Sequence, residues 1–430
     1  MMLVFVFVVL FALMLALGLP IFFSMGLASA LPLAIGSGAF TLADFGAWSI
    51  AKTMNSTGVP IVLFIIAGQV MSNGKLTEKI YDIFNYFLGA KNGFMPIVCI
   101  LTAMFYSSIS GSATAVTAAV GGMCMPLLME MGYNTAFCAS ILMCSGVLGF
   151  LIPPSTPLTV VIGLSDLDIT TGYMGGAVLG VTVGIILILY AYIYCRIRGN
   201  GNHEVIMAHH MAVKSKGFVA VFKESIWALL SPVIILGGIF SGLFTVAQAA
   251  VVSVIYGAVV SVLIYRTLDW KRCMQTVMDG LKTAVPLLVV LFAANVLSTC
   301  LEALDAATVI ANLIEQSGAG SMVVTLMILL ALFLLGMFMD SGTACYLLVP
   351  IVLPVAVRLG IHPYQLLVAM VGIQSVGLVT PPVGLALFTM MPICKLSVGE
   401  ITKTLWLPLI LFIAVCVIFA LFPSLTPFLG

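Results

Sequence analysis

Small hydroxyl residues and glycines interrupt apolar stretches of the chain at four places. The first two interruptions are "SSISGSATA" and "GFLIPPSTP", and the other two are "GMFMDSGTA" and "GLVTPPVG". A lipid bilayer tolerates irregular backbone only where protein or a water-filled cavity satisfies its polar groups. Freed carbonyls at half-helix ends can bind a cation, while half-helix N-termini attract an anion. Each pair of interruptions therefore predicts an ion site, and the two sites would flank a substrate.

The interruptions offer small neutral oxygen donors, which suit Na⁺ better than zinc or copper, since those metals favour His and Cys. The first half supplies Ser107, Ser108, Ser110, Gly111, Ser112 and Thr114, with Ser145, Gly149, Pro153, Pro154, Ser155 and Thr156. The second half supplies Gly336, Asp340, Ser341, Gly342 and Thr343, with Gly377, Thr380, Pro381, Pro382 and Gly384. For any single Ser or Thr the alternative is a hydroxyl bonded to its own helix. Asp340 is either a direct ligand or a residue near the outer surface.

The scarcity of charged residues in the apolar spans indicates the charge of the substrate. No basic residue lies deep in a span, so an anion would be met by half-helix N-termini, hydroxyls and bound cations. A cationic substrate could rely only on Asp340 and Asp44. The anion is the more economical hypothesis, because the breaks already provide positive helix ends.

The composition requires a membrane around these sites. Of 430 residues, 62% are hydrophobic and only 7% are charged, against roughly 25% charged in soluble domains. Apolar runs of about 20 residues recur, the length of a transmembrane helix, and no barrel-like alternation appears. We therefore expect an all-α integral membrane protein. A net charge of +1 argues against a nucleic-acid partner, the absence of a P-loop argues against ATP as the direct energy source, and ten scattered cysteines indicate buried apolar residues.

The two halves of the chain repeat the same parts at one constant offset in residue number. Pro126, Gly132, Gly149, Pro153 and Pro154 fall on Pro354, Gly360, Gly377, Pro381 and Pro382 without a gap. The expected units are 1–56 (N-terminal scaffold helices), 57–164 (first arm, hairpin and broken helix), 165–284 (scaffold helices with a cytoplasmic loop at 197–223), 285–391 (second arm, hairpin and broken helix) and 392–430 (C-terminal scaffold helix).

The topology of the repeat can be predicted from charge. If 94–131 and 322–357 are re-entrant hairpins, five crossings separate them, so the hairpins enter from opposite faces and the repeat is inverted. This arrangement places all of the 16 Lys and Arg residues on one side except Lys52 and Arg358. Such a bias marks the cytoplasmic side and leaves both termini outside.

Two further features predict packing and exposure. Gly172, Gly176, Gly180 and Gly184 form a stripe of small residues, which favours close contact with a helix of this chain or of a partner. The histidines at 203, 209 and 210 lie in the polar stretch, and we expect them to be solvated.

The motifs together resemble the large membrane subunit of tripartite ATP-independent periplasmic (TRAP) transporters. The strings that carry the resemblance are "SISGSATAVTAAVGGMCMPLLMEMGY", "LGFLIPPS", "GGIFSGLFTVAQAAVVSVIYG", "MFMDSGTACYLLVPIVLPVAVRLGIHP" and "VGLVTPPVGLALF", and they span essentially the whole chain. The family pattern often has Pro and Glu where this chain has Val246 and Gln248, which weakens any claim for a carboxylate on the scaffold. It also often has an Asn near Gln374 or Ser375, and this difference leaves open which side chain contacts the substrate.

The resemblance implies a role for each group of residues. One Na⁺ site would comprise Ser107, Ser108, Ser110, Gly111, Ser112, Ser145, Gly149 and Pro153, and the other Gly336, Asp340, Gly377, Thr380 and Pro382. Substrate contacts would come from Ser112, Thr114, Ser155, Thr156, Ser341, Thr343 and Gly384. The implied fold is of the elevator type, in which hairpins and broken helices move as a body against a scaffold.

The implied function is Na⁺-coupled import, not catalysis, across the bacterial inner membrane. The cargo would be an organic acid such as sialic acid or a C4-dicarboxylate. A periplasmic binding protein would deliver it, and a small four-helix membrane subunit would accompany this chain. Two alternatives stay open: a standalone Na⁺/dicarboxylate symporter that needs no binding protein, and a structural subunit that transports nothing.

Overall fold

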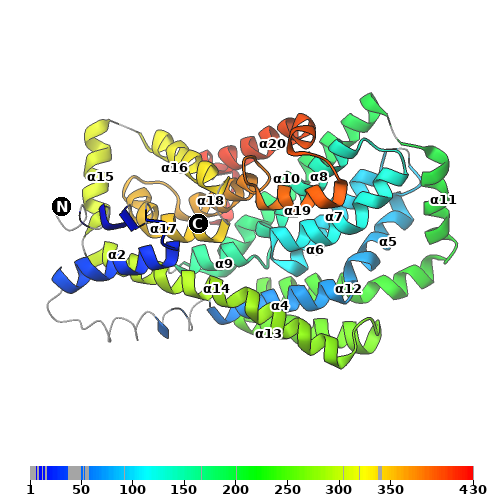
Figure 1. The fold of residues 1–430 in the computed structure, drawn as a ribbon, viewed down its shortest axis with the longest axis horizontal. Coiled ribbons are helices and arrows are strands. Elements are labelled where there is room, and N and C mark those ends of the chain that lie inside the picture. The colour runs from blue at the N-terminus through cyan, green and yellow to red at the C-terminus, as the bar shows by residue number, and fades with distance from the viewer. Residues whose placement is uncertain are drawn as a thin grey trace.

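The computed structural model describes residues 6, 9–11, 13–14, 17–36, 50–51, 53, 58–91, 93–165, 167–199, 201–303, 305–318, 320–337 and 341–429. Within these ranges every regular element is a helix (Figure 1). The all-α prediction is therefore confirmed for the described part of the chain.

The described elements of the first half follow in chain order. They are α2 (Ile21–Gly36), α4 (Val59–Asn73), α5 (Leu76–Leu88), α6 (Met95–Ser110), α7 (Ala113–Glu130), α8 (Thr135–Gly146), the 3₁₀ helix η2 (Val147–Phe150) and α9 (Thr156–Gly163). The break between α8 and α9 has local causes. Pro153 and Pro154 cannot donate helical hydrogen bonds, and Ser155 restarts the helix by accepting a bond from the Leu158 N–H at 3.2 Å.

The chain continues with α10 (Ile169–Arg198), α11 (His203–Lys214), α12 (Phe218–Phe240), α13 (Val246–Val259) with the π-helix η3 (Val260–Ile264), α14 (Trp270–Ala303), α15 (Ala306–Ser317), α16 (Ser321–Gly336), α17 (Ser341–Arg358), α18 (Pro363–Gly377), α19 (Leu385–Cys394), α20 (Val398–Leu421) and the short 3₁₀ helices η4 (Pro423–Leu425) and η5 (Pro427–Leu429). By length and composition six helices of the described residues can cross a membrane, namely α7, α10, α12, α13 with η3, α14 and α20. A seventh is formed if α4 and α5, which meet at a 63° bend, count as one span.

The helix boundaries repeat at the offset found in the sequence. α7 and α17 begin at Ala113 and Ser341 and end at Glu130 and Arg358, so both pairs of ends are repeat counterparts. The Pro153–Pro154 and Pro381–Pro382 peptide bonds, which correspond in the same way, are both cis. The amphipathic helices α5 and α15 lie at opposite ends of the long helices (Figure 1).

Packing divides most of the helices into two sets. We call α6–α10 and α16–α20 the hairpin group, and α2, α4 and α12–α14 the support group. Within the hairpin group the two halves interlock, since α7 packs on α19 and α17 packs on α9. α4 and α14 join the groups by contacting α6 and α17, respectively.

Two long helices differ from the expected domain boundaries. The ranges 165–284 and 392–430 were expected to hold scaffold helices, yet α10 packs on α6, α8, α9 and α18, and α20 packs on α8, α16 and α18. The glycine stripe explains the attachment of α10. A Cβ at Gly176 would lie 2.6 Å from the Leu151 carbonyl oxygen, and one at Gly180 would lie 2.7 Å from Ile152 Cγ1. The stripe therefore serves close packing within this chain, against the first break.

The polar stretch 197–223 is also more ordered than a loop. It contains α11 and the start of α12, and Asn202 caps α11 by accepting a bond from the Glu204 N–H at 3.0 Å. Among the three histidines expected to be solvated, His210 is only 2% exposed, with its Nδ1 3.0 Å from the Asn85 carbonyl oxygen. Its burial has a simple cause, because Ile206, His210 and Val213 share the face of α11 that packs on α5.

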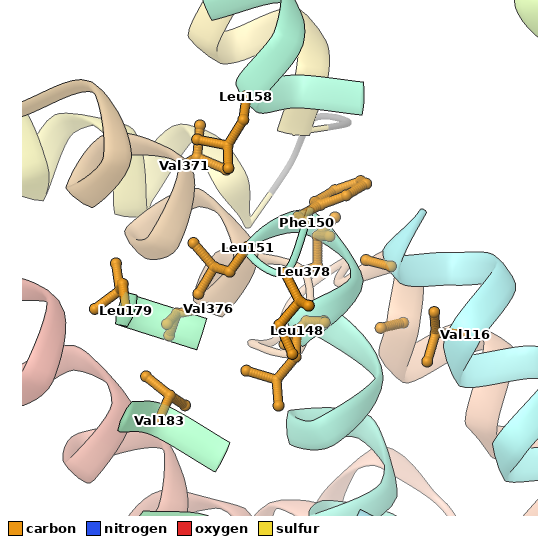
Figure 2. Close-up of a cluster of buried hydrophobic side chains, with 14 of the residues drawn as sticks. Val116, Leu148, Phe150, Leu151, Leu158, Leu179, Val183, Val371, Val376 and Leu378 are labelled. Atoms are coloured by element: carbon orange, nitrogen blue, oxygen red, sulfur yellow. The ribbon is translucent and has the colours of Figure 1, made fainter. Parts of the chain in front are cut away.

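The two breaks share a single apolar core. Figure 2 shows Leu148 and Leu151 from the first break in one cluster with Val376 and Leu378 from the second. All four side chains are fully buried or nearly so. The core thus holds the two proline-broken segments in a fixed relation to each other.

Candidate functional site

The first hairpin ends in a tight turn that touches the first break. α6 stops at Ser110, and Gly111 adopts a left-handed conformation with φ 63° before α7 begins. A Cβ at Gly111 would lie 2.6 Å from the Pro154 carbonyl oxygen, so both its conformation and its surroundings require glycine. The Thr156 N–H donates a hydrogen bond of 3.2 Å to the Gly111 carbonyl.

A similar link occurs in the second half, with a corresponding donor but a different acceptor. The Gly384 N–H donates a hydrogen bond of 3.3 Å to the Met337 carbonyl, just after α16 ends at Gly336. Gly384 is the repeat counterpart of Thr156. In each half, therefore, an amide at the restart of a broken helix binds a carbonyl at the end of a hairpin helix.

Glycines bring the backbones close enough for these links. A Cβ at Gly149 would lie 2.9 Å from the Ser112 carbonyl oxygen. A Cβ at Gly377 would lie 2.6 Å from the carbonyl carbon of Gly336. Because these glycines have no side chains, carbonyl oxygens of the hairpin ends lie close to those of the breaks. Hard cations prefer oxygen donors of this kind.

Several predicted hydroxyls bond within their own helices. Ser107 donates to the Ala103 carbonyl at 2.7 Å, Ser108 to Phe105 at 2.6 Å, Ser145 to Leu142 at 3.1 Å and Thr380 to Val376 at 2.8 Å. Each hydroxyl oxygen nevertheless keeps lone pairs that can accept a cation. Ser155 acts as a helix cap and also donates to the Phe150 carbonyl at 2.6 Å, which leaves one lone pair of its hydroxyl oxygen.

Three buried polar side chains near the breaks have no hydrogen bond among the described residues. They are the hydroxyls of Ser110 and Thr156 and the side-chain amide of Gln374. The Tyr106 hydroxyl lies near Ser110, but no hydrogen bond of ordinary geometry joins them. Leaving such groups unpaired costs about 1–3 kcal/mol each, so their placement needs another explanation. A bound water, an ion or a substrate oxygen would satisfy these groups.

A cavity of about 520 Å³ opens beside the first hairpin turn. Ser110, Ser112, Thr114 and Thr156 line it, and the hydroxyls of Ser112 and Thr114 are 3.3 Å apart. The N-terminal ends of α7 and α9 both face this space through these residues. None of the described lining side chains is charged. The cavity therefore offers hydroxyls and positive helix ends, as expected for an anion.

The cavity also contains residues that sequence analysis missed. Gln69 of α4 donates a 3.0 Å hydrogen bond to Thr283 of α14, and this pair forms the wall supplied by the support group. Tyr346 of α17 and Thr389 of α19 complete the lining from the second half. A lone polar residue within an apolar helix, such as Gln69, was the available signal. Gln374 does not line this cavity. Its Nε2 lies 3.1 Å from the position of a Cβ placed on Gly336, which belongs to the second predicted site.

The second predicted site is described only in part. Asp340 lies outside the described residues, as does the side chain of Ser341. Thr343 is half-buried in the first turn of α17. Gly384 has φ 49°, and a Cβ there would lie 2.9 Å from the carbonyl oxygens of both Leu378 and Thr380. The described part of this site is thus almost entirely backbone.

The long apolar helices, the interlocked halves and the paired breaks define a polytopic membrane protein of the transporter type. Residues 8–425 match the family described as "Tripartite ATP-independent periplasmic transporter, DctM component". The chain belongs to this family. It is therefore a multi-pass protein of the inner membrane and a permease subunit, not an enzyme.

Known relatives extend the comparison. The chain is 32% identical over 420 residues to "Isethionate TRAP transporter permease protein DctMQ" of Oleidesulfovibrio alaskensis, covering 97% of this chain but 65% of that protein. It is 30% identical over 357 residues to "C4-dicarboxylate TRAP transporter large permease protein DctM" of Pseudomonas aeruginosa, covering 83% of this chain and 82% of that protein. Its fold is similar to the structure of MtrF from Neisseria gonorrhoeae, with a TM-score of 0.65 and 13% identity over 93% of this chain and 94% of MtrF.

Proposed function

We propose that the chain is the transporting subunit of a Na⁺-coupled importer of an organic acid. The observation that carries the proposal is the cavity beside the first hairpin turn. Two helix N-termini face this cavity, and the buried hydroxyls of Ser110 and Thr156 make no hydrogen bond within the described chain. None of the described side chains that line it is charged. A cavity without fixed positive charge holds an acid best when helix ends and a co-bound cation share its charge.

Coupling would arise because both ions use the same turn. Na⁺ would bind the hydroxyl and carbonyl oxygens behind the turn, among Ser107–Ser112 and Ser145–Pro153. The acid would bind in front of it, at Ser112, Thr114 and Thr156. A cation on one side fixes the turn in the conformation that the anion needs on the other, so each ion strengthens the binding of the other. The second site, around Gly336, Gly377 and Thr380, would act in the same way in the other half.

Movement would occur between the two packing groups. We propose that the hairpin group, including α10 and α20, travels as an elevator against the support group. The interlocked contacts of α7 with α19 and of α17 with α9 favour motion of both halves as one body. The placement of α5 and α15 at opposite ends of the molecule supports an inverted repeat, an arrangement found in many alternating-access transporters.

A small four-helix membrane subunit and a periplasmic binding protein would complete the system. The isethionate relative is longer than the region that this chain matches, which leaves room there for a further membrane segment. The names of the relatives include both a sulfonate and a C4-dicarboxylate, so the cargo class is an organic acid and its identity is open.

Uptake in proteoliposomes tests the proposal. The chain is reconstituted with its small membrane subunit, and uptake of labelled acids is measured with and without a Na⁺ gradient and the cognate binding protein. Uptake that needs both supports the proposal. Full uptake without the binding protein would instead establish a standalone symporter.

A paired substitution addresses the third possibility, a structural subunit. Ser108→Phe and Thr380→Leu place bulky apolar groups at the two hairpin–break contacts. Unchanged uptake by a complex that carries both changes and still assembles would contradict a transporting role for this chain. Loss of uptake with normal assembly is the expected result.

A further inference from the structure

A second, larger cavity lies on the outer surface of the hairpin group, between α10, α20 and the start of α8. Its volume is about 1250 Å³, above the roughly 300–1,000 Å³ of ordinary small-molecule pockets. We call it the α10–α20 groove. It is separate from the cavity at the hairpin turn, and none of the residues assigned to transport lines it.

The groove is a built feature of the packing. α10 and α20 meet around Gly372, where a Cβ would lie 2.7 Å from Cys416 Sγ and 3.1 Å from Leu179 Cδ2. Beyond that point α8 fills the gap between them and forms the floor. Ser140 of α8 lies 2.8 Å from the Thr404 hydroxyl of α20. The groove therefore occupies only the halves of α10 and α20 that end at Arg198 and begin near Lys403.

One end of the groove is basic. Arg198 and Lys403 line it, and neither belongs to an ion pair among the described residues. The nearby carboxylate of Glu400 is engaged in capping α20, where it accepts bonds from the Ser397 N–H at 2.8 Å and hydroxyl at 2.6 Å. Within the described chain no acidic residue lines the groove. Two such cations at one mouth are complementary to an anionic head group.

The rest of the groove is aromatic and then aliphatic. Phe137 and Tyr194 stack at 3.8 Å with their rings nearly parallel, and Trp406 stands opposite with 55% of its surface exposed. Ile186 and Leu411 lie deepest along the two helices. This order of cation, aromatic ring and aliphatic surface is that of a membrane interface followed by hydrocarbon.

The length of the groove matches one leaflet. Ile186 and Arg198 are twelve residues apart on α10, which corresponds to about 18 Å along the helix. A bilayer with its head groups is about 40–45 Å thick, so the groove extends through nearly half of it. A soluble metabolite would leave the aliphatic part unused.

We propose that the α10–α20 groove binds one anionic glycerophospholipid, with its phosphate on Arg198 and Lys403 and an acyl chain along Ile186, Ile193 and Leu411. The lipid belongs to the leaflet on the side where Arg198 lies. Because α10 and α20 pack on the hairpins, the lipid is attached to the hairpin group.

Lipid titration of the whole protein in detergent tests the proposal. Phosphatidylglycerol should raise the Tm of delipidated protein, while phosphatidylcholine and inorganic phosphate should not. The double variant Arg198→Gln/Lys403→Gln should weaken the apparent phosphatidylglycerol affinity at least tenfold. The matched control Lys271→Gln/Arg272→Gln, which removes two exposed cations at the start of α14, should leave it unchanged.

A second readout protects the test against misfolded variants. Native mass spectrometry should find one retained anionic lipid on the control variant and none on Arg198→Gln/Lys403→Gln or on Ile193→Trp, which fills the apolar part. Equal stabilisation by phosphatidylcholine or by phosphate, or retention of the lipid in both groove variants, would overturn the proposal. A photocrosslinker at Ile193 that captures a protein chain in place of lipid would also overturn it.

Discussion

Gly68 of α4 lies directly against the backbone of Ser110 at the first hairpin turn. A Cβ on Gly68 would be 2.7 Å from the Ser110 carbonyl oxygen and 3.1 Å from its Cα. This contact joins the support group to the turn that carries the candidate ion site. The two groups can approach so closely only because position 68 has no side chain.

The first prediction concerns this contact. Gly68→Val should push the turn away from α4 and lower uptake at least tenfold, because the added atoms overlap backbone that cannot yield. The control is Gly122→Val in α7, where a Cβ meets no described atom within 4 Å. Both variants should assemble, and initial uptake rates separate them. Equal rates would show that the Gly68 contact does not matter for transport.

The second prediction concerns the turn itself. Gly111→Ala adds a backbone strain of about 1–2 kcal/mol at positive φ and a clash with the Pro154 carbonyl. Gly242→Ala introduces the same kind of strain at φ 75° but has no described atom within 4 Å. We expect Gly111→Ala to weaken the apparent Na⁺ affinity of uptake at least tenfold and Gly242→Ala to leave it unchanged. Matching Na⁺ titrations for the two would count against an ion site at the turn.

The third prediction uses the two buried hydroxyls at the turn. Ser110→Ala and Thr156→Val remove groups that make no hydrogen bond within the described chain, so the Tm should stay constant or rise. If the hydroxyls are ligands, the affinity for Na⁺ or for the acid falls at the same time. Ser253→Ala in α13, whose hydroxyl bonds its own helix at 2.7 Å, is the control. If the Tm rises while the affinities for Na⁺ and for the acid stay unchanged, the two hydroxyls are not ligands.

The fourth prediction compares two buried glutamines of α18. The side chain of Gln374 bonds to no described residue, whereas Gln365 donates to Thr426 at 2.6 Å. Gln374→Leu should therefore keep the Tm and lose uptake, and Gln365→Leu should lower the Tm and keep uptake in the protein that remains folded. Thermal unfolding and transport assays on the same preparations check this contrast. Normal uptake in Gln374→Leu would exclude Gln374 from the second site.

The fifth prediction is a pH dependence at the contact of α11 with α5. Burial lowers the pKa of His209 from its ordinary value of 6.5, and the neighbouring His210 adds to this, while Asp82 and Glu130 oppose it. A lowered pKa means that the unfolded chain takes up a proton before the folded one does. Stability is therefore unaffected above pH 6.5 and decreases as the pH falls below it.

The measurement is the Tm between pH 8 and pH 5. His209→Gln should flatten the acid part of this profile, whereas His203→Gln, at an exposed position, should not. A profile that is the same in all three proteins would place the acid sensitivity elsewhere.

The breaks and their order could be predicted from sequence because their causes are local. Pro153, Pro154 and their counterparts act on the bonds of their own helices, and a repeat offset can be counted. Gly111 also has a local cause, because the hairpin turn has positive φ at that position. The buried face of α11 was missed although its spacing, at 206, 210 and 213, was present in a stretch that polar composition marked as a loop.

Long-range packing could not be predicted in the same way. Gln69, Thr283 and Tyr346 come from three distant segments, and only the folded chain places them around one cavity. The glycine stripe of α10 indicated a close neighbour without identifying it. For that reason the sequence boundaries put α10 and α20 with the scaffold, while the contacts attach them to the hairpins.

The interlocking of the halves also has a consequence for how the protein is made. α7 needs α19 to cover it, yet α7 begins at Ala113 and α19 only at Leu385. At about 5–20 residues per second the ribosome takes roughly 15–50 s to supply that partner. During this interval the first hairpin, with its hydroxyl-rich turn, lies in the membrane with only part of its surface covered. We therefore expect the nascent chain to be exposed to misassembly and to quality control during that interval.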